Sequence, residues 1–596
     1  MPKSPRRTPL LLALALAAAF PALPALGASA EDATFAGETR EYLGRLERLG
    51  FAGVVLAARD GEPLFAEGFG LADRDRGVPW SPATVSTVGS ITKQFTGAAI
   101  LALAEDGRLR VEDPLPAHFE GVPEDKRAIT LHQLLTHSSG VVDLEGYGDW
   151  DPIGREEFVE KILAQPLAFE PGTDFRYSNA GYSLLGAIVE KLTGGSYESF
   201  VRERFFVPLG MFETGYVQAG WGEGRLAVGY RGEETWGTVL GRPMAEDGPY
   251  WVLRANGGIH TTAYDMLRWA RALLEGQVLA AGSMERLWAP HVREGEGADS
   301  SYSYGWAVLE MEDGTQVVTH NGGNGIFFAD LALVPAADIV VFLQTNVAAG
   351  NPYIDDLMSR VGHRLAEGRP YPEVPEVVAA DSERLAALAG EWTLAGGGRL
   401  RATVEEDALV VEPLDPAAFA RLLSEEPPDA ATLALGAERS RRLEEVASAL
   451  LAGDYRPLHR LYGGEVGLER LSEVWAERLA GFADRHGAPR GFDVLGTARR
   501  GEEDFTLVRF RHEDGAEKVA FVWQGEPDGR LLGISPGGLP SRLRFRAEAS
   551  GALAAWDPRS GGTVWLSSEG AGPDAPLRFG RGEGALQARR TEPGGP

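Results

Sequence analysis

The chain has 596 residues, no cysteine and a formal net charge of −28 at pH 7. No basic block offsets this charge, so we expect no nucleic-acid partner, because phosphate contacts need Lys and Arg gathered on one face. The absence of cysteine excludes disulfides, thiolate metal sites and a lipid-anchored cysteine. With 44% hydrophobic residues, a chain of this length is expected to form about two to four domains.

The N-terminus has the pattern of an export signal. Basic residues within the first seven positions precede an apolar run over 10–20, and the small residues 28–30 fit cleavage before Glu31. A membrane anchor is the alternative, but the apolar run is short and is followed by prolines. Residues 1–30 are therefore predicted to be a signal peptide. The mature protein is expected to be exported, to the periplasm or the outside of the cell, without a stable membrane anchor.

Apolar runs in the first two thirds of the chain predict strands with helices between them. The segments 53–58 and 63–68 are expected to form a hairpin around Asp60-Gly61. Further strands are predicted at 317–319, 329–333 and 339–344, and amphipathic or buried helices at 184–192 and 263–274.

The segment Ser90-Ile91-Thr92-Lys93 begins a run of helix-favouring apolar residues that ends at Asp106-Gly107. Its spacing places the Ser90 hydroxyl and the Lys93 amine one helical turn apart on the same face. A serine needs such a neighbour to attack a carbonyl, because its hydroxyl is too weakly acidic unless a base takes the proton. Alone, the pattern also fits a solvated helix face. The apolar neighbours predict burial instead, and burying a serine and a lysine without a function or a partner would cost free energy.

Two further motifs follow, Tyr177-Ser178-Asn179 and His320-Asn321-Gly322. Together with Ser90 and Lys93 they resemble the Ser-x-x-Lys, Tyr-x-Asn and Lys/His-x-Gly motifs of the serine β-lactamase and penicillin-binding protein superfamily. The closest likeness is its class C β-lactamase-related branch, which also holds D-alanyl-D-alanine carboxypeptidases, D-aminopeptidases and esterases. The resemblance covers the chain from about residue 45 to 365.

The resemblance implies that residues 31–366 form an α/β (α+β) β-lactamase-like catalytic domain. In such a domain an antiparallel sheet is flanked by helices, a helical subdomain is added, and the site lies at their junction. We expect no cofactor and no metal. His132 and His137 lie five residues apart, a spacing that suits no common zinc helix, and His137 is expected to hold a turn instead.

The catalytic residues are predicted to be Ser90, Lys93 and Tyr177. Ser90 would attack a carbonyl to give an acyl-enzyme. Burial would lower the pKa of Lys93 toward the neutral form that a base requires. Tyr177 is the second candidate base, and the sequence does not apportion the proton between the two.

Substrate binding is predicted for Asn179, His320, Gly322 and Gly323. Asn179 would hold the substrate amide or orient Lys93. By resemblance, the backbone amides of Ser90 and Gly323 would form the oxyanion hole.

His320 departs from the lysine that many β-lactamases carry at this position. A permanent cation there draws the carboxylate of the antibiotic, whereas histidine, with a pKa of ~6.5, is largely neutral at pH 7. We therefore expect weaker affinity for anionic β-lactams and favour peptide or ester substrates. Histidine also occurs here in D-alanyl carboxypeptidases of the same branch, so recognition of a carboxylate stays open.

The pattern changes after residue 366. The proline-rich stretch 367–381 predicts an extended linker. Short strands in 382–437 and 537–596 resemble a lipocalin-like β domain, split by an insertion at 438–536. Leu443, Val446 and Leu450 form an apolar stripe at helical spacing in the insertion and are expected to be core. The helix, helix, hairpin order of the insertion resembles the cone-shaped α+β fold of nuclear-transport-factor-like proteins. No catalytic constellation follows residue 366, so these parts are expected to serve accessory packing or substrate recognition.

The sequence thus predicts a secreted serine hydrolase that cleaves amide or ester bonds, in peptides with D-residues or in esters, through an acyl-enzyme on Ser90. Its partner would be a small-molecule or peptide substrate, selected by the loops 141–155 and 220–250. One alternative is a β-lactam hydrolase of class C type. Another is a catalytically inactive protein that binds cell-wall peptides, which the full set of catalytic residues opposes. The oligomeric state is not fixed by the sequence.

Overall fold

The computed structural model describes residues 29–591 except for short internal segments, namely 145, 223, 232–233, 296–297, 312–313, 349–353, 355–356, 425–426, 464–466, 501–502, 525–529, 537–540, 550, 558–561, 569–574 and 582–583. The predicted signal peptide, apart from its last two residues, lies outside the described residues. Within the described part, no helix combines the length and apolar character needed to cross a membrane.

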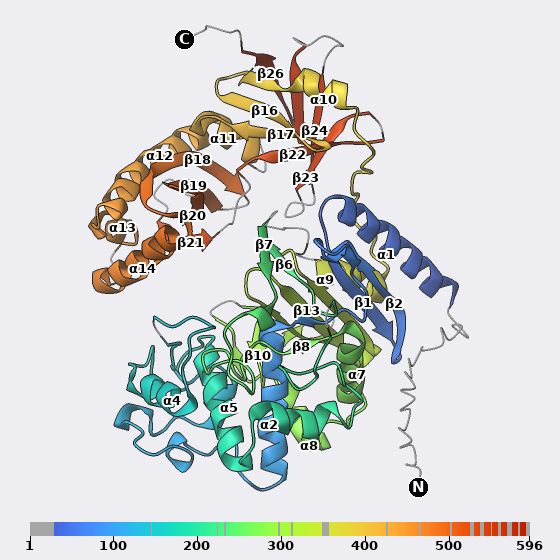
Figure 1. Cartoon of the computed structure of the whole chain (residues 1–596), viewed down its shortest axis with the longest axis vertical. Coiled ribbons are helices and arrows are strands. Elements are labelled where there is room, and N and C mark those ends of the chain that lie inside the picture. Colours follow the sequence, from blue (N-terminus) through green and yellow to red (C-terminus); the bar gives the residue numbers. More distant parts are fainter. Residues whose placement is uncertain are drawn as a thin grey trace, which may run out of the picture.

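The N-terminal part is built on an eight-stranded antiparallel sheet with the order β2-β1-β14-β13-β12-β11-β10-β9 (Figure 1). The predicted hairpin is confirmed, because β1 and β2 pair antiparallel around Asp60-Gly61. The three later predicted strands fall within β12, β13 and β14. The strands are β1 Gly53–Arg59, β2 Glu62–Phe69, β9 Val292–Arg293, β10 Ser300–Tyr302, β11 Ala307–Glu310, β12 Gln316–Gly323, β13 Phe328–Val334 and β14 Ile339–Thr345.

Both faces of this sheet are covered, as the alternation along β1 shows. Val55 and Ala57 belong to a core beneath helices α1 (Ala30–Arg48) and α9 (Leu357–Glu367). Their neighbours Val54, Leu56 and Ala58 belong to the larger core on the opposite face. Successive residues of a strand point to opposite faces, so a strand that is apolar throughout must be covered on both sides.

Helices gather on the second face of the sheet and form the helical part of the domain. The predicted helices at 184–192 and 263–274 lie in α5 and α7. Helix α2, which carries Lys93, is buried at every residue from Thr92 to Leu103. The helices are α2 Thr92–Glu105, α3 Leu131–Leu135, α4 Arg155–Ala164, α5 Asn179–Thr193, α6 Tyr197–Val201, α7 Ala263–Leu274 and α8 Ala281–Trp288. Short strand pairs complete this part, formed by β3 Leu71–Asp73 with β4 Val78–Pro79, β5 Ser86–Thr87 with β8 His260–Thr261, and β6 Gly229–Arg231 with β7 Glu234–Gly237.

The C-terminal part contains a closed eight-stranded barrel, β15-β16-β17-β22-β23-β24-β25-β26, preceded by α10 (Ser382–Leu388). The last strand, β26, lies within 537–596, where the sequence predicts short strands. It closes the barrel by pairing with β15, where Trp392 lies opposite Arg590. The strands are β15 Gly390–Leu394, β16 Arg399–Glu405, β17 Ala408–Pro413, β22 Leu543–Ala547, β23 Leu553–Asp557, β24 Gly562–Ser568, β25 Leu577–Arg581 and β26 Gly584–Arg590.

The segment between β17 and β22 folds as helices against a four-stranded sheet, β18-β19-β20-β21. The predicted apolar stripe Leu443, Val446 and Leu450 is buried in the core between them. Helix α12 begins at Ala430, where the Asp429 side chain caps its N-terminus, so the expected boundary at 437/438 falls inside a helix. The elements are α11 Pro416–Leu423, α12 Ala430–Leu451, α13 Arg456–Leu461, α14 Leu468–His486, β18 Pro489–Arg500, β19 Glu503–His512, β20 Ala516–Gln524 and β21 Leu531–Pro536.

Candidate active site

Ser90 lies on a short 3₁₀ turn, η1 (Gly89–Ile91), that leads directly into α2. The Lys93 side chain reaches back over this turn, and its Nζ lies 3.2 Å from Ser90 Oγ. The spacing of the sequence motif therefore brings the hydroxyl and the amine together, as expected. Gly89 allows the turn, because its φ of 51° falls in the left-handed region that favours glycine.

Lys93 is fully buried among hydrogen-bond acceptors. Its Nζ donates to Asn179 Oδ1 at 2.7 Å and to the backbone oxygen of Asn256 at 2.9 Å. Burial lowers the pKa of Lys93 to about 7, against the raising effect of the carboxylates of Asp143 and Asp149. A large fraction of the amine is therefore neutral at pH 7, and a neutral amine has a lone pair with which to accept a proton from Ser90.

Tyr177 approaches the same pair from the loop before α5. Lys93 Nζ lies 4.7 Å from the centroid of its ring. Burial raises the pKa of Tyr177, against the lowering effect of the nearby Ser90 side chain. The Tyr177 hydroxyl is therefore protonated at neutral pH, which leaves Lys93 as the group better poised to take a proton.

Asn179 is the first residue of α5, and its position depends on a residue that the sequence did not single out. Asp143 accepts hydrogen bonds from the backbone N–H of Ala180 at 2.8 Å and from Asn179 Nδ2 at 3.4 Å. This directs Asn179 Oδ1 toward Lys93. Asp143 and Asn179 are 36 residues apart, and no periodic pattern links them, so only the folded loop reveals the contact.

His320 is held in its neutral form on β12. Its Nδ1 lies 2.5 Å from the backbone oxygen of Asn321, which can only accept a hydrogen bond, so Nδ1 carries the proton. Its Nε2 then accepts from the Tyr302 hydroxyl at 2.8 Å. Burial and the charge of Lys93 lower the pKa of His320 to about 3. This agrees with the expectation that His320 is neutral at pH 7.

The end of β12 packs closely against the turn that carries Ser90. A methyl group added to Gly322 would lie 2.1 Å from the carbonyl oxygen of Val88 and 2.3 Å from the backbone nitrogen of Ser90. A methyl group added to Gly89 would lie 2.5 Å from the backbone nitrogen of Gly323. Only glycine permits this close approach of β12 to the turn η1, and Ser90 and Gly323 both line the cleft.

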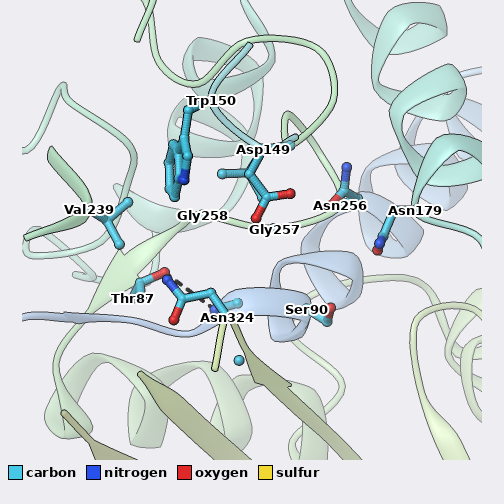
Figure 2. A pocket seen from close by; sticks show the side chains of 13 residues that line it. Thr87, Ser90, Asp149, Trp150, Asn179, Val239, Asn256, Gly257, Gly258 and Asn324 are labelled. Atoms are coloured by element: carbon cyan, nitrogen blue, oxygen red, sulfur yellow. Dashed lines mark hydrogen bonds between the residues drawn. The ribbon is translucent and has the colours of Figure 1, made fainter. Parts of the chain in front are cut away.

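A cleft opens in front of Ser90 (Figure 2). Asp149, Trp150 and Val239 come from the two loops expected to select the substrate. Of the predicted site residues, Lys93, Tyr177, His320 and Gly322 are not part of the lining. Lys93, Tyr177 and Gly322 lie against Ser90, which is, and the His320 ring lies 6.2 Å from that of Tyr177, measured between centroids. The lining residues are Thr87, Gly89, Ser90, Asp149, Trp150, Asn179, Val239, Leu253, Asn256, Gly257, Gly258, Gly323 and Asn324.

His137 has a structural role beside the site. Its backbone has a φ of 58°, and its Nδ1 accepts a hydrogen bond from the backbone N–H of Ser178 at 3.1 Å. Its ring lies 4.3 Å from that of Tyr177, measured between centroids. His137 thus holds the turn and supports the Tyr177 loop. Among the described residues, no group of three or more His, Cys, Asp or Glu is arranged to hold a metal ion.

This fold, with an activated serine at the junction of sheet and helices, defines a serine hydrolase. Residues 38–360 match the model of the β-lactamase family, and the chain belongs to that family. It is 28% identical over 386 residues to penicillin-binding protein 4* of Bacillus subtilis (strain 168), covering 61% of this chain and 84% of that protein. It is 30% identical over 355 residues to penicillin-binding protein 4 of Amycolatopsis lactamdurans, covering 55% and 89%.

The solved structures similar to this chain include one whose likeness extends over most of it. It is that of the octameric penicillin-binding protein homologue from Pyrococcus abyssi, with a TM-score of 0.52 and 20% identity, covering 84% of this chain and 99% of that one. The likeness shows the fold. Because it covers more than residues 38–360, it extends into the C-terminal part.

Proposed function

We propose that this protein is an exported hydrolase that cleaves amide bonds of peptides with D-residues, or esters, through an acyl-enzyme on Ser90. One observation carries the proposal, namely the buried amine of Lys93, which lies 3.2 Å from Ser90 Oγ and has a pKa lowered to about 7. A lysine that is partly neutral and in hydrogen-bond contact with a serine is a base poised for nucleophilic catalysis.

In the proposed reaction, Ser90 Oγ attacks the substrate carbonyl while its proton passes to Lys93 Nζ. The backbone N–H groups of Ser90 and Gly323 stabilise the oxyanion. The C–N or C–O bond then breaks, and the leaving group takes a proton through Tyr177 or from Lys93. Water hydrolyses the ester on Ser90 and restores the enzyme. Asn179 has the double role of orienting Lys93 and contacting the substrate amide.

The neutral state of His320 favours peptides and esters over β-lactams. Its two ring nitrogens are both engaged, by Tyr302 and by the backbone of Asn321, so it supplies no cation for the carboxylate of a penicillin. For the rest of the chain we propose, as the sequence predicts, a signal peptide at 1–30, a lipocalin-like barrel and an inserted nuclear-transport-factor-like domain. Their role would be accessory.

Intact-protein mass spectrometry after exposure to a fluorophosphonate and, separately, to a penicillin tests this function, with Ser90→Ala as the control. We expect labelling of the native protein that vanishes in the variant. A persistent penicillin adduct would support a peptidase, and rapid loss of the adduct with release of product would support a lactamase. If the folded protein forms no adduct with either reagent, it is a binding protein and the proposal is wrong.

The pH dependence of kcat/KM is expected to rise through pH of about 7, because this parameter reports ionisations of the free enzyme and Lys93 must lose its proton to act. Below that pH the amine is charged and cannot accept the proton of Ser90. Initial rates on a neutral ester such as p-nitrophenyl acetate would give the profile. If Tyr177 were the resting base, the rise would come above pH ~10 instead.

Asp330 provides the control for this profile. Burial raises the pKa of Asp330 to about 7 as well, but the residue lies on β13, away from the residues that line the cleft. The variant Asp330→Asn should therefore retain the rise at the same pH. A profile that became flat in this variant would assign the titration to Asp330 and not to Lys93.

A further inference from the structure

The cleft contains one charged side chain among the residues that line it, and this side chain is acidic. Figure 2 shows the carboxylate of Asp149 directed into the cleft, on the side away from Ser90. Asp149 is half-buried, and no hydrogen bond or ion pair joins it to any other described residue. Burial raises its pKa, against the lowering effect of Lys93. A half-buried carboxylate without hydrogen bonds or ion pairs lowers the stability of the fold unless a ligand pairs with its charge.

None of the described residues that line the cleft is a cation that could balance this charge. His320 is neutral, because Nδ1 donates to a backbone oxygen and Nε2 accepts from Tyr302. Lys93 lies behind Ser90 with none of its surface exposed, and its amine is engaged by Asn179 and Asn256. The charge carried by the lining residues themselves is therefore negative, which favours an ammonium group over a carboxylate.

The wall beside Asp149 is aromatic. Trp150 lines the cleft, its ring lies 6.4 Å from that of Trp236, and Trp236 in turn lies 5.8 Å from Phe327, measured between centroids. Val239 adds a further apolar side chain to the lining. Aromatic faces attract both apolar groups and cations. An amino group and an apolar side chain on one substrate residue would thus meet Asp149 and this wall together.

We propose that Asp149 selects substrates whose acyl part is an amino-acid residue with a free α-ammonium group, so that the enzyme releases N-terminal residues or cleaves aminoacyl amides and esters. This preference rests on the proposed function of Ser90. The carbonyl carbon of the N-terminal residue forms the ester bond to Ser90 Oγ, and the amine or alcohol beyond it leaves with a proton. Water then releases the free amino acid, whose ammonium group faced Asp149 throughout.

The test compares two substrates that differ only at the amino group, D-phenylalanine p-nitroanilide and its N-acetyl derivative, on the full chain. The wild-type protein is expected to have a kcat/KM about tenfold or more higher for the free amine. The ion pair between Asp149 and the ammonium group would be half-buried, and such a pair contributes more binding free energy than a fully exposed one. Asp149→Asn should lower the ratio of kcat/KM for the free amine to kcat/KM for the N-acetyl substrate by about tenfold, mainly through KM for the free amine. Any effect of the lost charge on the pKa of Lys93 acts on both substrates and leaves this ratio unchanged.

Asp151 offers a matched control two positions away. Its carboxylate accepts a hydrogen bond from the backbone N–H of Gly148 at 2.8 Å and does not line the cleft. Asp151→Asn keeps an acceptor at that place, so the ratio of the two rates should match that of the wild type. A fall in this variant equal to that in Asp149→Asn would attribute the effect to the loop and overturn the proposal.

A fluorophosphonate adduct measured on the same preparation distinguishes failure of the ammonium preference from failure of the proposed function of Ser90. An adduct on Ser90 together with equal rates for the two substrates, or with turnover of neither, would overturn the ammonium preference alone. An equal loss for both substrates in Asp149→Asn would do the same, since it would make Asp149 structural. Absence of both adduct and turnover would overturn the proposed function, and the preference with it.

Discussion

Replacement of Lys93 by methionine is expected to lower kcat by about 10³- to 10⁴-fold, the upper part of the range for loss of a general base. Methionine is close to lysine in length and fills the same buried space, but it has no lone pair that can take the proton of Ser90 at neutral pH. It also removes the hydrogen bonds to Asn179 Oδ1 and to the backbone oxygen of Asn256. Steady-state rates on p-nitrophenyl acetate, with circular dichroism to confirm folding, measure the effect.

Lys126 is the control for the loss of a buried lysine. It is 3% exposed, ends the short 3₁₀ turn Glu124–Lys126, and forms an ion pair with Asp125 at 2.6 Å, outside the cleft. Lys126→Met is expected to leave kcat within about twofold of the wild type, whatever it does to stability. Rates near those of the wild type in folded Lys93→Met would contradict the assignment of the base and shift it to Tyr177.

The contact between Ser90 and Lys93 could be predicted because it is local. A separation of three residues at the start of a helix fixes the geometry without knowledge of the rest of the chain. The hairpin of β1 and β2 was predictable for a similar reason, since both strands flank a two-residue turn. The family motifs supplied the remaining expected residues. Asn179 and Gly323 line the cleft, Tyr177 and Gly322 lie against Ser90, and His320 lies beyond Tyr177.

Asp143, Asp149 and Asn256 were not assigned roles, although each contacts or faces the central residues. Lys93 and Asn256 are 163 positions apart. Asp143 and Asp149 reach the site on the loop 141–155, which has no periodic sequence pattern from which their positions could be predicted. In the C-terminal part, the predicted apolar stripe of α12 is buried in the core. The helix begins at a cap on Asp429, before the apolar pattern, so that pattern alone does not mark where the helix starts.

Replacement of Gly322 by alanine is expected to affect both activity and stability. The added methyl group would lie 2.1 Å from the oxygen of Val88 and 2.3 Å from the nitrogen of Ser90, and both are backbone atoms that no side-chain rotation can move away. Either β12 or the turn η1 must shift, which costs about 1–3 kcal/mol of unfolding free energy. The shift moves the amide of Ser90 away from that of Gly323, so kcat should fall by about 10²- to 10³-fold, as for the loss of one oxyanion donor.

Gly282→Ala controls for the change of glycine to alanine itself. Gly282 lies exposed on α8, has nothing within 4 Å of the added methyl group, and should leave kcat unchanged while raising the free energy of unfolding by about 0.5–1 kcal/mol. Urea denaturation and steady-state rates on both variants separate the two effects. If Gly322→Ala lost stability but kept its kcat, the shift of β12 would not affect stabilisation of the oxyanion. The Gly323 amide would then not be an oxyanion donor, and the mechanism would need another donor in its place.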